Sequence, residues 1–428
     1  MARSRKRTAM WILVAIVATA VVVLLALNLS GGRTRIEHEI PPLYGVGDEQ
    51  FVRTMGVLLG PSIAGGNRIT ALQNGDEIFP AMLEAIRSAE KTITFETYIY
   101  WSGRIGREVA EALAERAQAG VKVHVLLDWL GSGKMDDELL QMMETAGVEV
   151  LKYHPLRWHS LDRVNNRTHR KLLVVDGRIG FTGGVGIADE WLGHAEDSLH
   201  WRDSHYRVVG PAVAQMQAAF MDNWIKTRSL VLHGTEYFPP IDTAGPHLAQ
   251  VFKSSSDDGS ESVRLMYLMS IASAEKSIRL SASYFVPDSL AIASFIAARE
   301  RGVDVRIIVP GRHIDAPMVR RASRASWGPL LEAGVRIYEF QPTMYHCKVM
   351  IVDDRWVSVG STNFDNRSFK LNDEANLNVL DPEFAAEQSG VFEEDLARSK
   401  EITLAAWRAR PWKEKLVERL ASLVRAQL

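Results

Sequence analysis

The chain has 428 residues, of which 46% are hydrophobic and 24% are charged. This is an ordinary globular composition, and the length is sufficient for two domains. The formal net charge of -2 at pH 7 argues against a broad basic surface for nucleic acid, so we expect no nucleic-acid partner. The single cysteine, Cys347, excludes an intrachain disulfide and does not indicate on which side of a membrane the chain lies.

The N-terminus combines a basic tail, residues 1–8, with an apolar stretch that carries no charged residue. We predict a transmembrane helix at residues 9–28, because about 20 apolar residues in a helix cross one bilayer. A cleaved signal peptide is the alternative. The excess of basic residues before the span favours a cytoplasmic N-terminus and a body on the non-cytoplasmic side. Residues 29–66 are then a linker.

The rest of the chain contains two copies of one unit. The tetrapeptide Ser-Ala-Glu-Lys occurs at residues 88–91 and again at 273–276, each time before a β-rich run. A helical segment follows in each copy and ends at Gly120 or Gly302, before an apolar strand. This alternation predicts an α/β fold with a largely parallel sheet in each of two similar α/β/α halves, related by a pseudo-twofold axis. The predicted divisions are a first repeat at 67–228, a connecting segment at 229–260 and a second repeat at 261–395.

Each copy contains the pattern His-x-Lys-x-x-x-x-Asp. The two occurrences are His169, Lys171 and Asp176, and His346, Lys348 and Asp353. Side chains at i and i+2 of a strand share a face, so each histidine projects beside its lysine. Two ammonium groups can stabilise the oxygens of a phosphodiester, while one imidazole attacks phosphorus and the other transfers protons. Because the i+2 partner is lysine and not a metal ligand, we expect neither a metal nor a cofactor.

Four small residues and two acids follow the motifs at matched places. The small residues are Gly183, Gly184, Gly360 and Ser361, which we expect to let backbone N–H groups approach a phosphate. The acids, Asp203 and Glu374, are candidates for accepting a histidine N–H and so fixing the imidazole tautomer. The alternative for both is an ordinary acid at a strand edge.

The pattern H-x-K-x4-D-x6-G-[GS], present twice, resembles the phospholipase D superfamily over nearly all of residues 67–395. The run GSTNFDNRSFKLNDEANLNV is similar to bacterial cardiolipin synthases of the short, single-anchor type. This resemblance implies that His169 is the nucleophile, that His346 is the general acid and base, and that the lysines clamp the phosphate while the motif aspartates brace the site. One departure concerns an asparagine of the family pattern: Asn363 supplies it in the second copy, whereas Gly186 stands at the matching place in the first.

The resemblance implies phosphatidyl transfer to phosphatidylglycerol with release of glycerol, by a single-pass protein of the bacterial cell membrane. Phospholipids are then the substrates, with phosphatidylethanolamine an alternative donor or acceptor, and the bilayer is the partner. Three other functions remain open: a phospholipase D that uses water as acceptor, a nuclease, and a scaffold without catalysis. The sequence does not predict an oligomeric state.

Two segments distinguish this chain further. The first copy carries ten extra residues before its motif, within 154–168, and this basic, aromatic insertion could contact a lipid headgroup or be a simple surface loop. The C-terminal residues 396–428 have the pattern of a basic amphipathic helix. Such a helix either lies on an anionic membrane surface or packs against the body.

Overall fold

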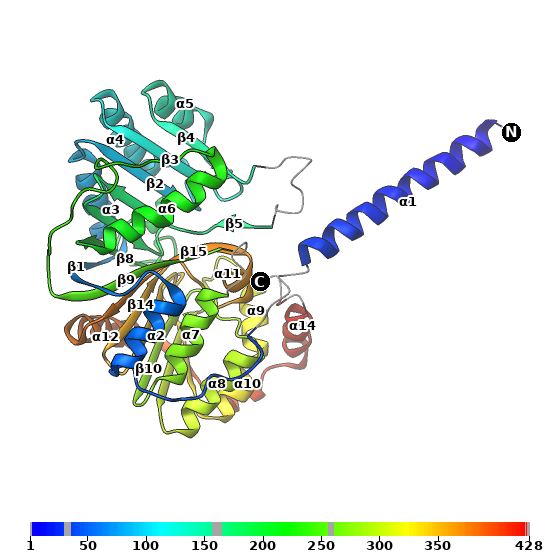
Figure 1. Ribbon diagram of the computed structural model, residues 1–428. Coiled ribbons are helices and arrows are strands. Elements are labelled where there is room, and N and C mark those ends of the chain that lie inside the picture. Colours follow the sequence, from blue (N-terminus) through cyan, green and yellow to red (C-terminus); the bar gives the residue numbers. More distant parts are fainter. Residues whose placement is uncertain (1, 30–35, 156–164, 256–260, 424, 426–428) are drawn as a thin grey trace.

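The computed structural model describes residues 2–29, 36–155, 165–255, 261–423 and 425. Its body has three layers, with one sheet between two sets of helices, and helix α1 (Ala2–Leu29) projects away from the body (Figure 1). The predicted basic tail is part of α1 from Ala2 onward. Within the described residues, no helix has both the length and the apolar character needed to cross a membrane. The membrane span at 9–28 therefore stays a prediction.

A single 16-stranded sheet runs through both halves. The strands of the first half are β1 (Ala64–Gln73), β2 (Thr92–Thr97), β3 (Lys122–Asp128), β4 (Glu149–Tyr153), β5 (Arg167–Thr168), β6 (Leu172–Val175), β7 (Ile179–Gly183) and β8 (Ser204–Val209). Those of the second half are β9 (His247–Ser254), β10 (Ser277–Ala282), β11 (Asp304–Pro310), β12 (Arg336–Phe340), β13 (Lys348–Val352), β14 (Trp356–Gly360), β15 (Asn372–Leu380) and β16 (Ser399–Ile402).

The strand order is the same in both halves. It runs β4-β3-β2-β6-β7-β8-β1 in the first and β12-β11-β10-β13-β14-β15-β9 in the second, with β16 added beyond β12. The two orders meet where β1 and β9 pair antiparallel at the centre of the sheet. A pseudo-twofold axis therefore passes between β1 and β9, and the α/β class predicted from the sequence is confirmed.

The expectation of a largely parallel sheet is wrong. In the first half only the pairs β2–β3 and β3–β4 are parallel, whereas β2–β6, β6–β7, β7–β8 and β8–β1 are antiparallel. The reason lies in the connections. The link from β6 to β7 is a short turn at Asp176 and Gly177, and a turn of this length can join only antiparallel strands, because parallel strands need a long crossover.

Helices cover both faces of the sheet (Figure 1). They are α2 (Glu49–Leu59), α3 (Asn74–Arg87), α4 (Arg104–Gln118), α5 (Asp137–Thr145), α6 (Ala212–Arg228), α7 (Ser262–Ala272), α8 (Ser289–Glu300), α9 (Pro317–Ala325), α10 (Trp327–Glu332), α11 (Asn366–Lys370), α12 (Pro382–Ala397), α13 (Leu404–Arg408) and α14 (Trp412–Ser422). On one face, α6 and α12 share a core with strands of both halves. On the other face, α3 to α5 cover the first half, and α2, α7, α8 and α10 cover the second. The common core makes the two halves one folding unit.

The repeated Ser-Ala-Glu-Lys segments lie against the motif aspartates. The Asp176 carboxylate accepts the backbone N–H groups of Glu90, Lys91 and Thr92 at 2.7–2.9 Å. Asp353 does the same for residues 275–277, also at 2.7–2.9 Å. Both aspartates have left-handed backbone angles, with φ of +52° and +55°, which aspartate tolerates better than most residues. Each motif aspartate thus ties the end of its strand to the start of the neighbouring strand.

Three predicted segments differ from the structure. The predicted linker, 29–66, contains α2, whose Phe51 and Met55 are buried in the core of the second half, and the start of β1. Strand β9 lies within 229–260, which we predicted to be a connecting segment, yet it pairs with β15 over seven residues and is central to the sheet. The C-terminal residues 396–428 do not form one helix, because β16 joins the sheet edge before α13 and α14. Helix α14 packs on α9 through Ala421, and its buried Glu418 forms ion pairs with arginines. Packing against the body is therefore the observed arrangement for α14.

We predict that replacing Asp176 by Ala destabilises the fold without a direct effect on catalysis. Three N–H groups lose their acceptor, so the free energy of unfolding should fall by about 1–3 kcal/mol. Chemical denaturation of Asp176→Ala measures this change, and Asp242→Ala, at an exposed aspartate, is the control. A variant that unfolds like the parent but no longer turns over substrate would instead make Asp176 part of the catalytic machinery.

Candidate active site

Each motif histidine is held by two consecutive residues of the opposite half. The backbone N–H of His169 donates to the carbonyl of Asp373 at 2.8 Å, and its Nδ1 lies 3.0 Å from both carboxylate oxygens of Glu374. The backbone N–H of His346 donates to the carbonyl of Arg202 at 2.8 Å, and its Nδ1 lies 2.7 Å from Oδ2 of Asp203. The two arrangements are equivalent under the pseudo-twofold axis, and each crosses between the halves.

The two carboxylates that the sequence singled out are fully buried, and each is fixed by further bonds. Asp203 accepts the indole N–H of Trp191 at 2.9 Å and the backbone N–H of Ser204 at 2.8 Å. Glu374 accepts the hydroxyl of Ser361. These bonds hold each carboxylate where it accepts the Nδ1–H of a histidine, which leaves Nε2 of the imidazole as the nitrogen with a lone pair.

Both lysines are buried beside their histidines. Lys171 Nζ donates to the carbonyl of His169 at 3.0 Å. Lys348 Nζ donates to the carbonyl of His346 at 2.6 Å and to Ser283 Oγ at 2.8 Å. The i and i+2 spacing places each histidine beside its own lysine, and the contacts that cross between the halves bring the two pairs to one site. Asp176 and Asp353 are not part of this group: five residues separate Lys171 from Asp176, which is about 16 Å along an extended chain.

Two of the small residues after the motifs lie against the histidine-binding carboxylates, and their backbone N–H groups donate to backbone carbonyls. The N–H of Gly184 donates to the Ser204 carbonyl and that of Ser361 to the Ala375 carbonyl, both at 3.1 Å. The expectation that these N–H groups contact a phosphate is therefore wrong for Gly184 and Ser361, and it stays a prediction for Gly183 and Gly360. A Cβ at residue 184 would lie 2.2 Å from an oxygen of Asp203, so glycine is needed for that carboxylate to fit. Gly183 and Gly360 end the adjoining strands β7 and β14.

A cavity of about 260 Å³ opens onto His169, Lys171 and His346. Its other lining residues are Tyr98, Ile99, Arg167, Trp191, Trp201, Tyr284, Asp315, Val319, Asn363, Asp365, Arg367 and Asn372. Apart from Asn363, the sequence interpretation did not assign these residues to the site. A usable signal was the position of Tyr98 and Ile99, which directly follow a buried strand in the first copy as Ser283 and Tyr284 do in the second. Residues 156–164 of the predicted insertion lie outside the described residues.

The two sides of the cavity are chemically different. The ring of Tyr98 lies 5.2 Å from that of His169, whereas the equivalent Ser283 donates to Asn363 Oδ1 at 2.6 Å. The rings of Trp191 and Trp201 lie 5.3 and 5.5 Å from that of His346.

Gly186, opposite Asn363 in the pseudosymmetry, faces Ile99, where an added Cβ would lie at 2.8 Å. An asparagine therefore does not fit in the first half, because Ile99 and the Trp191 ring occupy the space that its side chain would need.

Burial makes the charges of the site costly. It lowers the pKa of His169 to about 4 and also lowers the pKa of His346, next to Lys348. Burial together with Lys348 lowers the pKa of Lys171 to about 7. For Glu374, burial alone would raise the pKa, but its partner His169 and the nearby Lys171 hold it below the ordinary value. The site therefore contains ionised carboxylates and neutral imidazoles, the state in which Nε2 is a nucleophile.

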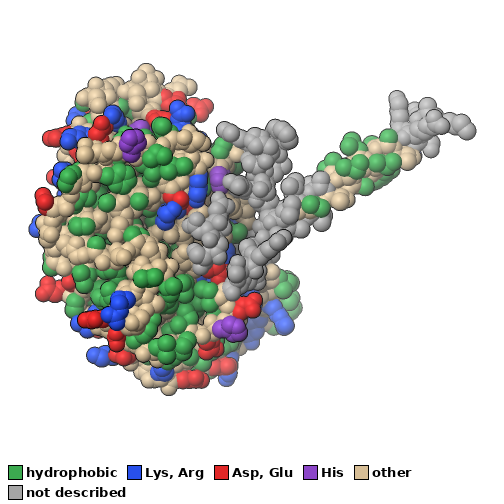
Figure 2. Space-filling model, viewed as in Figure 1, with side chains coloured by type: hydrophobic (Ala, Val, Ile, Leu, Met, Phe, Trp, Pro, Cys, Tyr) green, Lys and Arg blue, Asp and Glu red, His purple; other side chains and the backbone are tan. Residues whose placement is uncertain are grey.

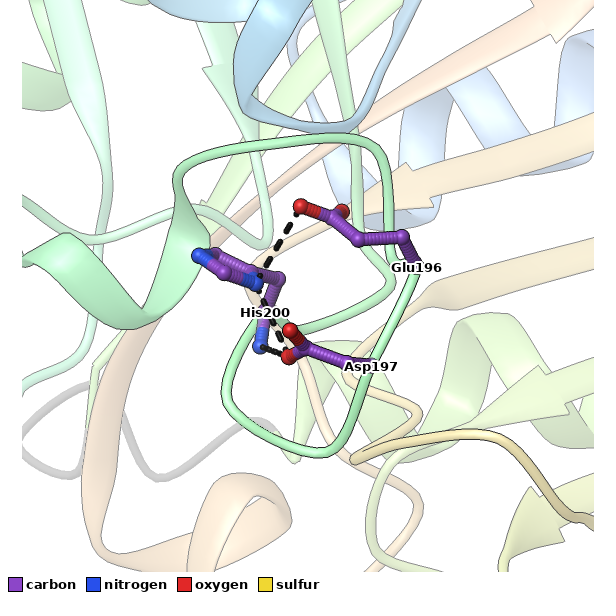
Figure 3. Close-up of side chains that lie close together, drawn as sticks. All are labelled: Glu196, Asp197 and His200. Atoms are coloured by element: carbon purple, nitrogen blue, oxygen red, sulfur yellow. Dashed lines mark hydrogen bonds and ion pairs between the residues drawn. The ribbon is translucent and has the colours of Figure 1, made fainter.

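Among the described residues, one cluster of potential metal ligands occurs, and it does not include the motif histidines and lysines. Glu196, Asp197 and His200 lie on one loop with their ligand atoms within 4.8 Å of one another (Figure 3). The sequence interpretation found no such cluster. The carboxylates are largely engaged locally, since Asp197 accepts the N–H groups of Leu199 and His200 and lies 2.9 Å from Nδ1 of His200. These exposed residues give no reason to assign a metal to the reaction.

A pair of His-x-Lys strands that meet across a pseudo-twofold axis defines the phospholipase D-like class, and comparison with known proteins agrees. A family described as "Cardiolipin synthase, PLD-like domain" matches residues 82–224 and 267–396. Cardiolipin synthase 1 of Bacillus anthracis is 36% identical over 363 residues, which cover 82% of this chain and 71% of that protein. A cardiolipin synthase of Staphylococcus aureus is 34% identical over 361 residues, covering 84% and 73%.

Among solved structures, the phosphatidylserine synthase of Haemophilus influenzae has a TM-score of 0.66 at 16% identity, covering 88% of this chain and 100% of that one. That likeness shows the fold. The sequence matches show the family, and the chain belongs to the cardiolipin synthase family of phospholipase D-like proteins.

We predict that kcat/KM for a phosphodiester substrate falls as the pH rises through about 7, because Lys171, whose pKa is about 7 in the free enzyme, then loses its proton. The positive charge is fully present only below that pKa, so the loss is on the alkaline side. A pH profile of kcat/KM measures it. In Lys171→Arg the charge persists at higher pH, and the alkaline fall should move upward. An identical alkaline limb in the two enzymes would contradict this origin.

Proposed function

We propose that this protein is a cardiolipin synthase, a phosphatidyltransferase that moves a phosphatidyl group from one phosphatidylglycerol to another and releases glycerol. The observation that carries the proposal is the pair of buried histidines, each fixed by a carboxylate of the opposite half, in one cavity with a lysine beside each. The names of the relatives support the choice of substrate. Phosphatidylethanolamine is a further donor or acceptor compatible with the same chemistry.

In the first step, Nε2 of His169 attacks the phosphorus of the donor. An N–P bond forms, the bond from phosphorus to the glycerol oxygen breaks, and His346 gives that oxygen a proton. The lysines stabilise the negative charge of the phosphoryl oxygens. His346 must be cationic for this step, although burial lowers its pKa in the empty site. The bound anionic phosphate provides the compensating charge, and the ionised Asp203 supports the imidazolium.

In the second step, a hydroxyl of the acceptor phosphatidylglycerol attacks the phosphohistidine. Its proton passes to His346, the new O–P bond forms, and the N–P bond to His169 breaks. Glu374 holds Nδ1 of His169 in both steps, so the ring orientation is the same for attack and for departure. In the proposed assignment Asp176 and Asp353 are structural. The proposed catalytic unit comprises both repeats, 67–228 and 261–395, and the family matches to residues 82–224 and 267–396 support this division.

The test uses purified protein with phosphatidylglycerol in mixed micelles and lipid mass spectrometry. We expect cardiolipin and glycerol in equal amounts. Accumulation of phosphatidic acid without cardiolipin would instead identify a phospholipase D that uses water. His346→Ala should slow the transfer about 10²–10⁴-fold, the usual contribution of general acid–base catalysis.

A second measurement assigns the histidines. A phosphatidyl p-nitrophenyl ester releases a leaving group that needs no proton, so His346→Ala should still become labelled by the phosphatidyl group but should not turn over. His169→Ala should not become labelled. The reverse labelling pattern would make His346 the nucleophile and leave the transfer itself in place.

We propose further that residues 9–28 anchor the protein as a single-pass span in the bacterial cell membrane. Its N-terminus would be cytoplasmic and its body non-cytoplasmic. Hydrophobic side chains line the described part of α1, and those from Met10 to Val17 are exposed (Figure 2). Near the other end of the chain, α14 exposes Trp412, Leu416 and Leu420 beside the exposed Arg419. An apolar row with basic neighbours is suited to an anionic membrane surface.

Carbonate extraction of membranes tests the anchor. The full chain should stay in the pellet, and a variant lacking residues 1–28 should be released. Protease added to intact spheroplasts should cleave the body if it is non-cytoplasmic. Complete protection, together with cleavage after lysis, would place the body on the cytoplasmic side.

A further inference from the structure

The cavity contains two arginines in addition to the motif residues. Arg167 and Arg367 both line it together with His169 and His346. Arg167 is 1% exposed, and its Nη1 lies 3.6 Å from Oδ1 of Asp128. Arg367 is half-buried and comes from the second half, but it donates to the side chain and carbonyl of Asn165 in the first half, at 3.0 and 3.2 Å. The two arginines therefore come from opposite halves and line one cavity, and Arg367 contacts Asn165, two positions before Arg167.

These arginines break the pseudosymmetry that the catalytic residues obey. Met344 occupies the position equivalent to Arg167, and Glu190 the position equivalent to Arg367. The histidines, lysines, motif aspartates and histidine-binding carboxylates all occur in pairs because the fold and the chemistry at phosphorus need them in both halves. The fold does not require this pair of arginines, because the equivalent positions hold other residues. We therefore attribute the pair to a feature of one substrate that the other substrate lacks.

The acidic residues of the cavity are engaged by their own neighbours. Asp315 accepts the hydroxyl of Tyr284 at 2.8–2.9 Å, and Asp365 accepts the N–H of Ser368 at 2.8 Å at the start of α11. These bonds fix the two carboxylates beside neutral donors, so the arginines are the groups of the cavity that offer a place for a second anion. Guanidinium groups suit a phosphodiester because they offer two parallel N–H donors to two oxygens.

The proposed transfer needs such a place. Its acceptor is a phospholipid that carries its own phosphodiester, which does not react but enters the cavity close to the phosphoryl group held on histidine. Two anions in one buried site repel each other strongly unless cations separate them. We propose that Arg167 and Arg367 form the subsite for the non-reacting phosphate of the acceptor phospholipid. This inference rests on the proposed function and adds the means by which a lipid acceptor is chosen over water or free glycerol.

The experiment compares acceptors with and without a phosphate in Arg367→Gln. The full-length enzyme receives the phosphatidyl p-nitrophenyl ester as donor, and phosphatidylglycerol or free glycerol as acceptor. We expect KM for phosphatidylglycerol to rise about 10- to 100-fold, the loss expected for a charge-assisted, bidentate contact. Release of p-nitrophenol and transfer to glycerol should stay within about twofold of the parent. Arg367→Lys, which keeps the charge but not the fork, should recover part of the loss.

Two further variants complete the test. Arg336→Gln removes an arginine that is ion-paired with Glu401 at the sheet edge. This control should change neither KM for phosphatidylglycerol nor the rate of transfer to glycerol. Arg167→Lys keeps a cation beside Asp128 but not the fork, and should show a smaller loss that is again selective for phosphatidylglycerol, so it replaces Arg367→Gln if that variant does not fold.

Equal loss with both acceptors, slower release of p-nitrophenol, or no change with either would overturn the subsite. A parent enzyme that makes no cardiolipin at all would refute the proposed function instead, so the two failures are distinguishable.

Discussion

The site depends on two hydrogen bonds in which a carboxylate of one half binds the motif histidine of the other half. Neither half contains a motif histidine together with the carboxylate that orients it, because His169 is bound by Glu374 and His346 by Asp203. Both carboxylates are completely buried, and an unpaired buried charge costs several kcal/mol. Their hydrogen bonds and the buried lysines offset that cost only when the halves are packed together. The catalytic geometry and the association of the halves are thus one property of the fold, and the central pairing of β1 with β9 maintains both.

The histidines and their carboxylates are arranged symmetrically, whereas the residues that line the cavity around them differ. This arrangement suits a reaction in which the two histidines have different roles. In the proposed reaction one imidazole forms a bond to phosphorus and the other moves protons, although their carboxylate and backbone contacts are alike. The difference can come only from what surrounds them. Tyr98 adjoins His169, whereas tryptophan rings adjoin His346, and Asn363 has only Gly186 as its counterpart. Such differences change polarity and shape near each ring while leaving the bonds to Nδ1 intact, so substrate preference can vary without loss of the catalytic set.

The sequence could predict those features that depend on local periodicity and on the internal repeat. The α/β class, the helix ends at Gly120 and Gly302 and the shared face of each His-x-Lys pair depend on neighbouring residues. The two acids could also be singled out, since both follow the motifs at matched places. Their assignment to the opposite half could not, because it depends on contacts between residues 205 and 143 positions apart. The sequence did not predict strand β9 or the hydrogen bonds of the Gly184 and Ser361 N–H groups for the same reason. Sheet pairing depends on residues from different segments of the chain.

The electrostatics of the site favour the binding of an anion. With both imidazoles neutral and the ammonium of Lys171 near its pKa of about 7, the cavity holds less positive charge than its residues could carry. A bound phosphodiester reverses this, because its negative charge raises the pKa of every neighbouring base. In the proposed mechanism, substrate binding therefore favours the cationic state of His346 that protonates the leaving alcohol. Since burial in the shared core makes those pKa values so sensitive, the packing of the two halves controls the protons as well as the geometry.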